Sequence, residues 1–591
     1  MDTHTFADHS TRLARLRDWI AGQGLDGMIL TTADAFQNED APEHDRDIAW
    51  LTGFTGSLAH ALVMADGAVF LVDGRYGIQA QQEVDGADWT FGHIHDAPLG
   101  GWLRDRAAGC TIGYDPMRWS VAQMQGLRDK AGTATLTPCD DPFDAVWSDR
   151  PAMPQAPVRA LPEAEAGRSA GDKLQWLAQE LDQQGAGVWV ETRPDNIAWL
   201  FNMRGGDVAM NPLPLSFATV TAEGAAHWFI DPAKCKDIQP EGVTLHPIEA
   251  FLPWLKEQTA ACAFDPAFTP DAVEQALGES RHAKGIVTIE KALKSRAELD
   301  GFRRAHLDDA VAMAHFGHWL SEVMQGEALP DETAAAVQLE AFRAKSEDYQ
   351  EPSFVTIAAT GGNAAMCHYH PPAQGSARLA RDAVFLCDSG GQYTGGTTDV
   401  TRTYAFAPVS AEVRRIATAV LRGFIALSRA QFPDGTMPHQ IDALARAPLW
   451  EMGLDYDHGT GHNVGHNLLV HEHPHRIGQK PNPFALRAGH VLTLEPGFYE
   501  ADVWGIRVEN QVEVVARDAG FIGFDAMTLV PIDLGLYDLD TLDAGERDWI
   551  DSYHAQVREA VAPLLSGAVR EWLIAATAPL DQRAPQVSDK R

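Results

Sequence analysis

The sequence predicts an α/β (α+β) protein of several domains, and three patterns support this class. The first is an internal repeat: the pentapeptide DIAWL at Asp47–Leu51 returns as NIAWL at Asn196–Leu200. The second is a region, residues 289–531, in which apolar runs of strand length alternate with glycine turns. The third is the helical spacing of apolar residues in residues 532–591. With 591 residues, the chain is long enough for about two to four domains, each with its own core.

The flanks of the repeat recur together with it. Each copy is preceded by a helix-like stretch, a glycine stop and a short apolar run, and is followed by a strand–turn–strand pattern. The apolar runs are Gly27–Leu30 and Gly187–Val190. We therefore predict two related α/β domains, residues 1–155 and 156–288, with a proline-rich linker between them.

Two further segments follow the predicted pair of domains. An amphipathic helix, expected over Glu298–Met324, opens the third domain, residues 289–531, which carries the candidate functional residues. In residues 532–591, Trp549, Tyr553, Val557 and Val561 lie at helical spacing. We expect this last segment to be a helical extension that covers apolar surface of the third domain.

The composition excludes several classes of function. The chain has 82 acidic and 47 basic residues, a formal net charge of −35, so a nucleic-acid or anionic-membrane partner is not expected. Six cysteines are scattered without a C-x-x-C pair, which is typical of reduced thiols. The sequence has neither a signal-peptide pattern at its start nor an apolar run of about 20 residues. We expect a cytoplasmic protein.

Four carboxylates follow or end apolar runs in the third domain. The apolar run Val384–Cys387 is followed directly by Asp388, and a glycine-rich turn separates Asp388 from Asp399. If the two runs form antiparallel strands, both aspartates lie at one end of a sheet. Val491–Leu494 likewise leads to Glu495.

The fourth carboxylate, Glu509, follows Gly505–Val508. Strand alternation places Arg507 and Glu509 on one face, and Ile506 and Val508 off it. Buried together, four anions would repel each other by several kcal/mol, at about 4 Å separation and an effective dielectric near 20. A group of this kind needs a cationic partner such as a metal ion.

A cluster of histidines supplies candidate nitrogen ligands and acid–base groups. His458 and His462 flank Gly459 and Gly461, which allow a close approach of the backbone, and His471 follows in the same segment. His466, His473 and His475 are interpreted as solvated loop residues. Oxygen-rich donors with imidazole suit two divalent cations, with Mn²⁺ as the first choice and Co²⁺, Fe²⁺ or Zn²⁺ also compatible. Such a pair lowers the pKa of a bridging water to about 7 and favours hydrolysis.

Seven segments together resemble the creatinase-fold metallopeptidases of family M24, and most closely the three-domain aminopeptidase P (Xaa-Pro aminopeptidase) group. They are AWLTGFTGS (49–57), DGRY (73–76), IAWLFNMRG (197–205), LCDSGGQYTGGTTDVTRT (386–403), HGTGHNVGHNLLVHE (458–472), LEPGFYE (494–500) and GIRVEN (505–510). The resemblance implies two creatinase-N-terminal-like domains followed by a pita-bread catalytic domain, and a homodimer.

The resemblance also implies roles for individual residues. The expected metal ligands are Asp388, Asp399, His462, Glu495 and Glu509, with Asp399 and Glu509 bridging the two ions. The substrate-site histidines match His368, His458 and His471, with His368 chosen over His370 because HY follows the Gly362–Ala365 segment. The expected reaction removes the residue before a proline from the amino terminus of a peptide, by attack of a hydroxide that bridges the two metals.

The expected contributions of the side chains follow from this chemistry. Glu495 moves the proton to the departing nitrogen, and His368 and His471 donate hydrogen bonds to the carbonyl oxygen. His458 forms a wall of the proline pocket, and Arg507 orients an acidic neighbour.

Two alternatives share parts of this pattern. A prolidase, which cleaves Xaa-Pro dipeptides, would have the same five ligands but is typically shorter and has no duplicated α/β unit. A creatinase-fold binding protein without activity would lack the ligands. Val355, Gly362 and His370 depart from the family pattern, which bears on substrate preference rather than on the metal site.

Overall fold

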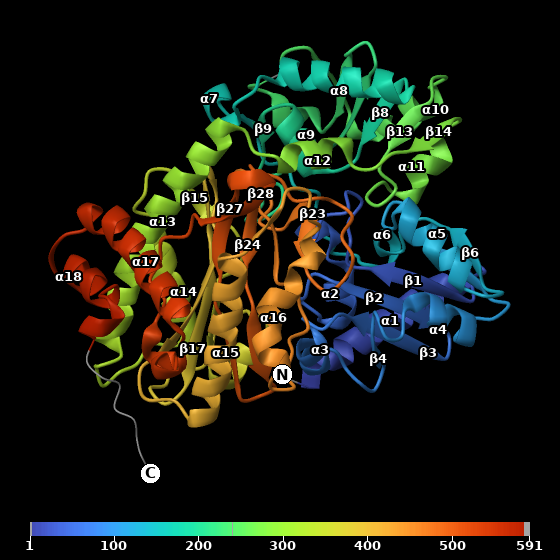
Figure 1. The fold of residues 1–591 in the computed structure, drawn as a ribbon. Coiled ribbons are helices and arrows are strands. Elements are labelled where there is room, and N and C mark those ends of the chain that lie inside the picture. Colours follow the sequence, from blue (N-terminus) through green and yellow to red (C-terminus); the bar gives the residue numbers. More distant parts are fainter. Residues whose placement is uncertain (1–2, 239, 584–591) are drawn as a thin grey trace. The chain divides into compact units, whose positions relative to one another are not determined.

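The computed structural model describes residues 3–238 and 240–583. The chain divides into two compact units, Met1–Lys291 and Ala292–Arg591. Both units contain helices and strands, as expected for the predicted class (Figure 1). Among the helices of the described residues, none has the length and apolar character that a membrane span requires.

The first unit contains a six-stranded sheet in the order β4-β3-β2-β1-β5-β6, in which β1–β2 and β2–β3 are antiparallel and the other neighbours parallel. Its strands are β1 (Gly27–Thr31), β2 (Ala59–Met64), β3 (Gly67–Val72), β4 (Thr90–His93), β5 (Thr111–Tyr114) and β6 (Thr135–Pro138). The helices are α1 (Thr3–Gly22), α2 (Asp47–Thr52), α3 (Gly77–Glu83), α4 (Leu99–Arg106), α5 (Val121–Lys130) and α6 (Phe143–Val146).

A second six-stranded sheet in the same unit has the order β12-β11-β10-β8-β13-β14, with the same pattern of parallel and antiparallel neighbours. Its strands are β8 (Val188–Glu191), β10 (Phe217–Thr221), β11 (Ala226–Phe229), β12 (Val243–His246), β13 (Cys262–Phe264) and β14 (Ser280–His282); β7 (Arg159–Ala160) and β9 (Met203–Arg204) pair separately. The helices are α7 (Glu163–Ala166), α8 (Ala170–Gln184), α9 (Pro194–Leu200), α10 (Phe251–Lys256), α11 (Asp271–Ala276) and α12 (Ile286–Ala292).

The two sheets confirm the predicted duplication. DIAWL lies in α2 and NIAWL in α9, and each helix belongs to the connection that follows the central strand, β1 or β8. The pentapeptide recurs because its isoleucine and leucine are buried in both copies.

The described strands of the second unit form four sheets. A six-stranded sheet has the order β21-β28-β27-β24-β22-β23, and the smaller ones are β16-β17-β20, β15-β18-β19 and β25-β26. The strands are β15 (Tyr349–Pro352), β16 (Ile357–Thr360), β17 (Val384–Ser389), β18 (Gly391–Tyr393), β19 (Gly396–Thr397), β20 (Val400–Ala405), β21 (Gln431–Pro433), β22 (Gly461–Asn463), β23 (Glu472–Ile477), β24 (Val491–Leu494), β25 (Gly497–Glu500), β26 (Trp504–Arg507), β27 (Asn510–Ala516) and β28 (Phe521–Ala526).

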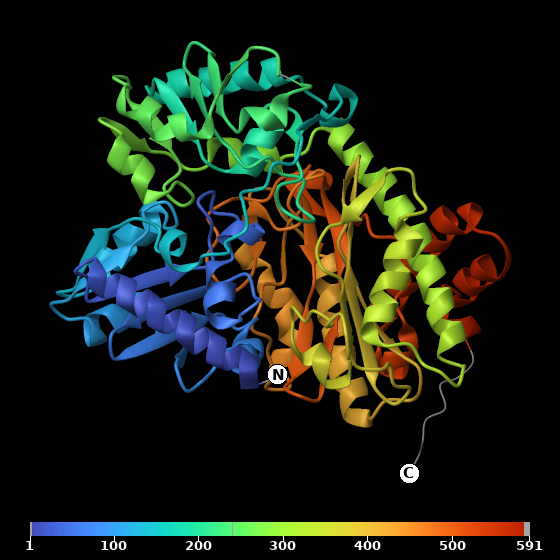
Figure 2. The same cartoon turned by 180° about the vertical axis from the view of Figure 1, so that it is seen from behind.

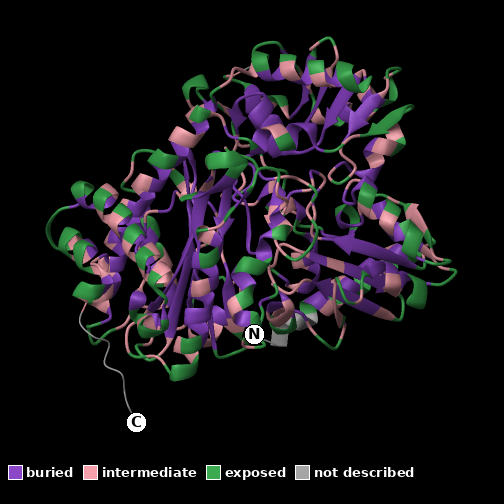
Figure 3. Cartoon of the chain, viewed as in Figure 1, coloured by how far each residue is buried: buried purple, intermediate pink, exposed green. Residues whose placement is uncertain are grey.

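Helices cover these sheets, whose strands are largely buried (Figure 3). They are α13 (Arg296–Val323), α14 (Glu332–Arg343), α15 (Ala411–Ser428), α16 (Asp442–Trp450), α17 (Ala544–Val561) and α18 (Gly567–Ala576). The long helix α13 begins after Ser295, whose hydroxyl and backbone N–H exchange hydrogen bonds with Glu298 in a capping box.

The C-terminal extension is helical, as predicted. Its helices α17 and α18 both contact α13 (Figure 2). The ring of Trp572 fills the space that Gly317 leaves on α13, where a Cβ atom would overlap it. Isoleucine, tyrosine and valine side chains of α17 join the main hydrophobic core, so the extension is part of the folded unit.

Candidate metal centre

The predicted aspartate pair comes from two adjacent strands. Strands β17 and β20 are antiparallel, with Asp388 opposite Thr401 and Ser389 opposite Val400, and Asp399 directly precedes β20. The sequence therefore predicted correctly that both aspartates lie at one end of a sheet. Both are more than nine-tenths buried.

Of the two predicted glutamates, one follows its strand as expected and the other does not. Glu495 follows β24 as predicted, but the single strand expected around Glu509 is wrong: β26 ends at Arg507 and β27 begins at Asn510. The break occurs because β26 pairs with β25, whereas β27 pairs with β24 and β28 of another sheet. Glu509 sits at this transfer between sheets, where its carboxylate accepts a hydrogen bond from Thr401 at 2.7 Å.

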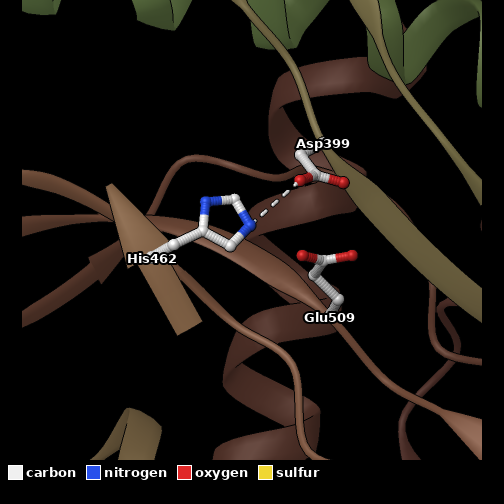
Figure 4. Close-up of side chains that lie close together, drawn as sticks. All are labelled: Asp399, His462 and Glu509. Carbon is white, nitrogen blue, oxygen red and sulfur yellow. Dashed lines mark ion pairs between the residues drawn. The ribbon is translucent and has the colours of Figure 1, made fainter. Parts of the chain in front are cut away.

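Three of the five predicted ligands form a compact group. Asp399, His462 and Glu509 each offer one ligand atom, and these atoms all lie within 4.8 Å of one another (Figure 4). The His462 Nε2 atom is 3.6 Å from an oxygen of Asp399 and 3.6 Å from an oxygen of Glu495. Its Nδ1 lies 2.8 Å from the backbone carbonyl of Asn463, a contact that leaves Nε2 to face the carboxylates.

Asp388 and Glu495 lie outside this compact group. One oxygen of Asp388 accepts a hydrogen bond of 2.5 Å from Arg507. Its other oxygen is buried and has no hydrogen-bond partner among the described residues. A buried carboxylate oxygen of this kind is costly unless a further ligand binds it.

The electrostatics of the acidic cluster favour binding of a cation. Burial, followed by the charges of Asp388 and Glu495, raises the pKa of Asp399 well above its usual range. Burial and the neighbouring carboxylates raise the pKa of Glu509 in the same way, and burial raises that of Glu495 to about 7. Arg507 alone does not offset the acidic groups. The cluster offers carboxylate oxygens, one imidazole nitrogen and an Asp388 oxygen that has no hydrogen-bond partner among the described residues. This set of donors fits hard divalent cations.

The three histidines predicted for the substrate site have different neighbours. The ring of His471 is 4.4 Å from that of His462, and His368 stacks near His471 with ring centroids 6.2 Å apart. His458 instead contacts Tyr499, with 2.9 Å between its Nε2 and the tyrosine hydroxyl. His370 is exposed.

Tyr499 is a candidate functional residue that was not identified from the sequence. Its hydroxyl accepts a hydrogen bond of 2.6 Å from Arg507, so a chain of polar contacts connects His458 through Tyr499 and Arg507 to Asp388. Only the fold reveals its role: Gly497 faces Arg507 across the β25–β26 hairpin, and a Cβ at Gly497 would lie 2.6 Å from the Tyr499 oxygen. The glycine thus leaves room for the tyrosine.

The interpretation of His466 and His475 as solvated loop residues is wrong. Both are at least 98% buried. His475 lies 2.6 Å from the Asn463 side-chain oxygen and packs on His490, with ring centroids 4.1 Å apart. His466 packs edge-on against Phe302.

Comparisons with known proteins match the chain over most of its length. Residues 300–516 match the model of metallopeptidase family M24, residues 12–146 and 149–298 match creatinase/prolidase N-terminal domains, and residues 520–580 match the C-terminal region of peptidase M24. A "Probable Xaa-Pro aminopeptidase P" of Laccaria bicolor is 36% identical, covering 96% of this chain and 93% of its own. Aminopeptidase P1 of Arabidopsis thaliana is 33% identical, covering 97% and 99%.

Solved structures agree with these matches. The X-prolyl aminopeptidase of Caenorhabditis elegans, described as a cytosolic enzyme with a dinuclear active site, has a TM-score of 0.93 and 32% identity, covering 97% of this chain and all of its own. A dipeptidase of Mycobacterium ulcerans, with a TM-score of 0.51 and 24% identity, covers 62% of this chain and shares the fold alone.

Proposed function

The chain belongs to metallopeptidase family M24, within its Xaa-Pro aminopeptidase P group, and from this premise we infer that it removes the amino-terminal residue from peptides with proline in the second position. It is a metal-dependent hydrolase. One observation carries the inference: Asp399, His462 and Glu509 gather in a buried cluster within a chain that matches aminopeptidase P relatives over almost its full length.

Asp388, Asp399, His462, Glu495 and Glu509 are the proposed ligands of two divalent cations. Two observations support this set: three of the residues form a buried cluster, and one buried oxygen of Asp388 has no hydrogen-bond partner among the described residues. When bound, such a pair supplies Lewis acidity and makes a water nucleophilic at neutral pH. Mn²⁺ is the proposed ion because oxygen ligands dominate.

The remaining side chains orient the substrate and move protons. Glu495 takes the proton of the attacking water at its carboxylate and delivers it to the proline nitrogen, which is a poor leaving group until protonated. His368 and His471 donate hydrogen bonds to the carbonyl oxygen of the cleaved bond. Arg507 holds Asp388 and Tyr499, and Tyr499 holds His458, the proposed wall of the proline pocket.

The prolidase alternative has less support. The dipeptidase neighbour covers only 62% of this chain, whereas the X-prolyl aminopeptidase covers 97%. The duplicated α/β unit and the helical extension therefore favour the aminopeptidase, and the filled ligand positions disfavour a binding protein without activity.

Several finer properties are proposals of the same kind. We propose a cytoplasmic location, since the Caenorhabditis elegans relative is described as cytosolic. A homodimer is proposed only because the family resemblance implies one. The net charge of −35 supports a protein that binds neither nucleic acid nor anionic membranes. The domain boundaries near residues 155, 288 and 531 are proposed likewise.

A pair of peptides tests the proposed activity. The purified chain is incubated with Arg-Pro-Pro and with Arg-Ala-Pro, with and without Mn²⁺. Release of arginine from Arg-Pro-Pro alone, lost with a chelator and in Glu495→Gln, is the expected result. Equal cleavage of both peptides, or cleavage of neither with Mn²⁺ present, would contradict it.

A further inference from the structure

Glu332, the first residue of α14, has a fully buried side chain in the second unit. Its carboxylate accepts hydrogen bonds from four groups of one loop. The donors are the backbone N–H of Thr360 (2.7 Å), the side-chain amide of Asn363 (3.0 and 3.1 Å), the hydroxyl of Tyr369 (2.7 Å) and the backbone N–H of Ala377 (3.3 Å). We name residues 360–377 the clamped loop.

The chemistry of this contact requires a carboxylate. A buried anion is costly unless several donors surround it, and here both oxygens are bonded by donors of the clamped loop. Burial and the contact with Glu332 raise the pKa of Tyr369, so its hydroxyl stays protonated and donates. Asn363 also donates to the Tyr369 oxygen at 3.0 Å, which ties the two donors together.

The clamped loop carries a proposed substrate residue. His368 directly precedes Tyr369, so fixing the tyrosine ring fixes the backbone from which the histidine projects. The His368 ring stacks on His471 at an interplanar angle of 23°, and His471 adjoins His462. The loop has little regular structure of its own: after Thr360, the last residue of β16, it contains the short 3-10 turn Gly361–Ala365 and no further helix or strand.

We propose that Glu332 is a positioning residue of the peptidase reaction, acting through Tyr369 to hold His368 in register with His471. This inference rests on the proposed function, because it assigns Glu332 to the carbonyl-binding side of that same site. Nothing in the sequence pattern marks Glu332, since it stands 36 residues before His368, on a different element.

Two variants and a matched control test the role. Tyr369→Phe removes one hydroxyl, and Glu332→Gln replaces an all-acceptor group with one that has a donor facing other donors. Glu340→Gln makes the same change at an exposed position of α14 and is the control. Tyr369→Phe keeps the test valid even if Glu332→Gln does not fold.

Steady-state kinetics with Arg-Pro-Pro and metal content are measured for each variant. For Tyr369→Phe we expect kcat/KM to fall about tenfold or more, mainly in kcat, with metal content unchanged. The control keeps wild-type values. An unchanged kcat/KM in Tyr369→Phe would overturn the proposal.

A double-variant test shows whether Tyr369 acts by positioning His368 or by supporting the fold in general. In a His368→Ala background, adding Tyr369→Phe should change kcat/KM by less than about twofold, because the group through which it acts is absent. Independent, multiplying effects of the two substitutions would overturn the proposal.

An activity-free measurement distinguishes failure of this proposal from failure of the proposed function. With histidine rings labelled for NMR, the signal that disappears in His368→Ala should shift in Tyr369→Phe and stay in place in Glu340→Gln. A signal that does not move in Tyr369→Phe overturns the positioning role. Failure of the wild-type chain to cleave Arg-Pro-Pro would instead count against the proposed function.

Discussion

The hydroxyl of Tyr553, in α17 of the C-terminal extension, lies 2.9 Å from Nη2 of Arg402 in β20. The same guanidinium donates to the backbone carbonyl of Glu509 at 2.6 Å and to the side chain of Asn510 at 2.8 Å. Both Tyr553 and Arg402 are buried. The extension therefore reaches, through one buried cation, the backbone of a proposed metal ligand.

This contact predicts that Tyr553→Phe weakens the second unit. The Tyr553 hydroxyl also accepts a hydrogen bond of 3.3 Å from the backbone N–H of Val530, whereas Nη2 of Arg402 keeps two other acceptors. The substitution therefore leaves this buried backbone N–H without its acceptor, which costs about 1–3 kcal/mol of unfolding free energy. Denaturant unfolding measures the loss, and transfer of metal to a chelator should also become faster because Glu509 is held less firmly.

Tyr537→Phe is the matched control. Tyr537 is also buried in the second unit, but its hydroxyl makes no hydrogen bond to the described residues. We expect Tyr537→Phe to lower the unfolding free energy by less than Tyr553→Phe does. We expect it to leave the rate of metal release unchanged. Equal effects of the two substitutions would argue against a specific role of the Tyr553–Arg402 contact.

Arg507→Lys should weaken metal binding even though the charge is kept. Arg507 reaches Tyr499 with one terminal nitrogen and Asp388 with the other, and the single nitrogen of lysine cannot serve both. We expect a 10–100-fold loss in metal affinity or activity, about the size typical of residues that orient ligands. Manganese titration by calorimetry measures the loss, and Arg415→Lys at an exposed site of α15 serves as control. Wild-type affinity in Arg507→Lys would show that Asp388 needs no such partner.

Gly317→Ala should destabilise the chain although alanine favours helices. Within α13 the exchange would normally add about 0.5–1 kcal/mol of stability. Here the new methyl group would overlap the ring of Trp572, and overpacking of this kind costs about 1–3 kcal/mol.

Gly126→Ala in α5 is the matched control and should not destabilise the chain, because nothing lies within 4 Å of a Cβ atom at that position. Thermal unfolding should show a lower midpoint for Gly317→Ala and an equal or higher one for Gly126→Ala. A stabilised Gly317→Ala would mean that Trp572 moves away at little cost.

The sequence predicts best those features that depend on neighbours in the chain. The duplicated α/β unit, the helix after Ser295 and the antiparallel pairing of β17 with β20 follow from local periodicity and turns, and the structure confirms them. The strand expected through Glu509 is wrong because its two halves pair with different partner strands, which alternation along one segment does not reveal. The five metal ligands and three substrate-site histidines remain predictions.

Residues that support the site through distant partners were not predicted for a related reason. Glu332, Arg402 and Tyr499 have ordinary local surroundings in the sequence. Their roles arise from contacts with Tyr369, Tyr553 and Arg507, respectively, which only the folded chain brings close. The same holds for His466 and His475, whose burial depends on helices and loops elsewhere in the second unit.

The stability of the chain should fall in mild acid, and His554 supplies part of this dependence. His554 is buried in α17, and its Nε2 accepts a hydrogen bond of 3.1 Å from the backbone N–H of Ile532, which requires an unprotonated nitrogen. Burial, with Arg583 and Arg402 adding to it, lowers its pKa to about 3 from the ordinary 6.5. Below pH 6.5 the unfolded chain therefore takes up a proton that the folded chain refuses, so acid favours unfolding.

His554→Gln tests this assignment, because glutamine can accept the same hydrogen bond without titrating. Between pH 7.5 and pH 5, the wild-type chain should lose about 2 kcal/mol of unfolding free energy through His554 that the variant keeps. Denaturant unfolding at both pH values measures the difference, and pH 7.5, where the histidine is neutral in both states, gives the cost of the substitution itself. Parallel losses in the two proteins would show that His554 takes up its proton in the folded state.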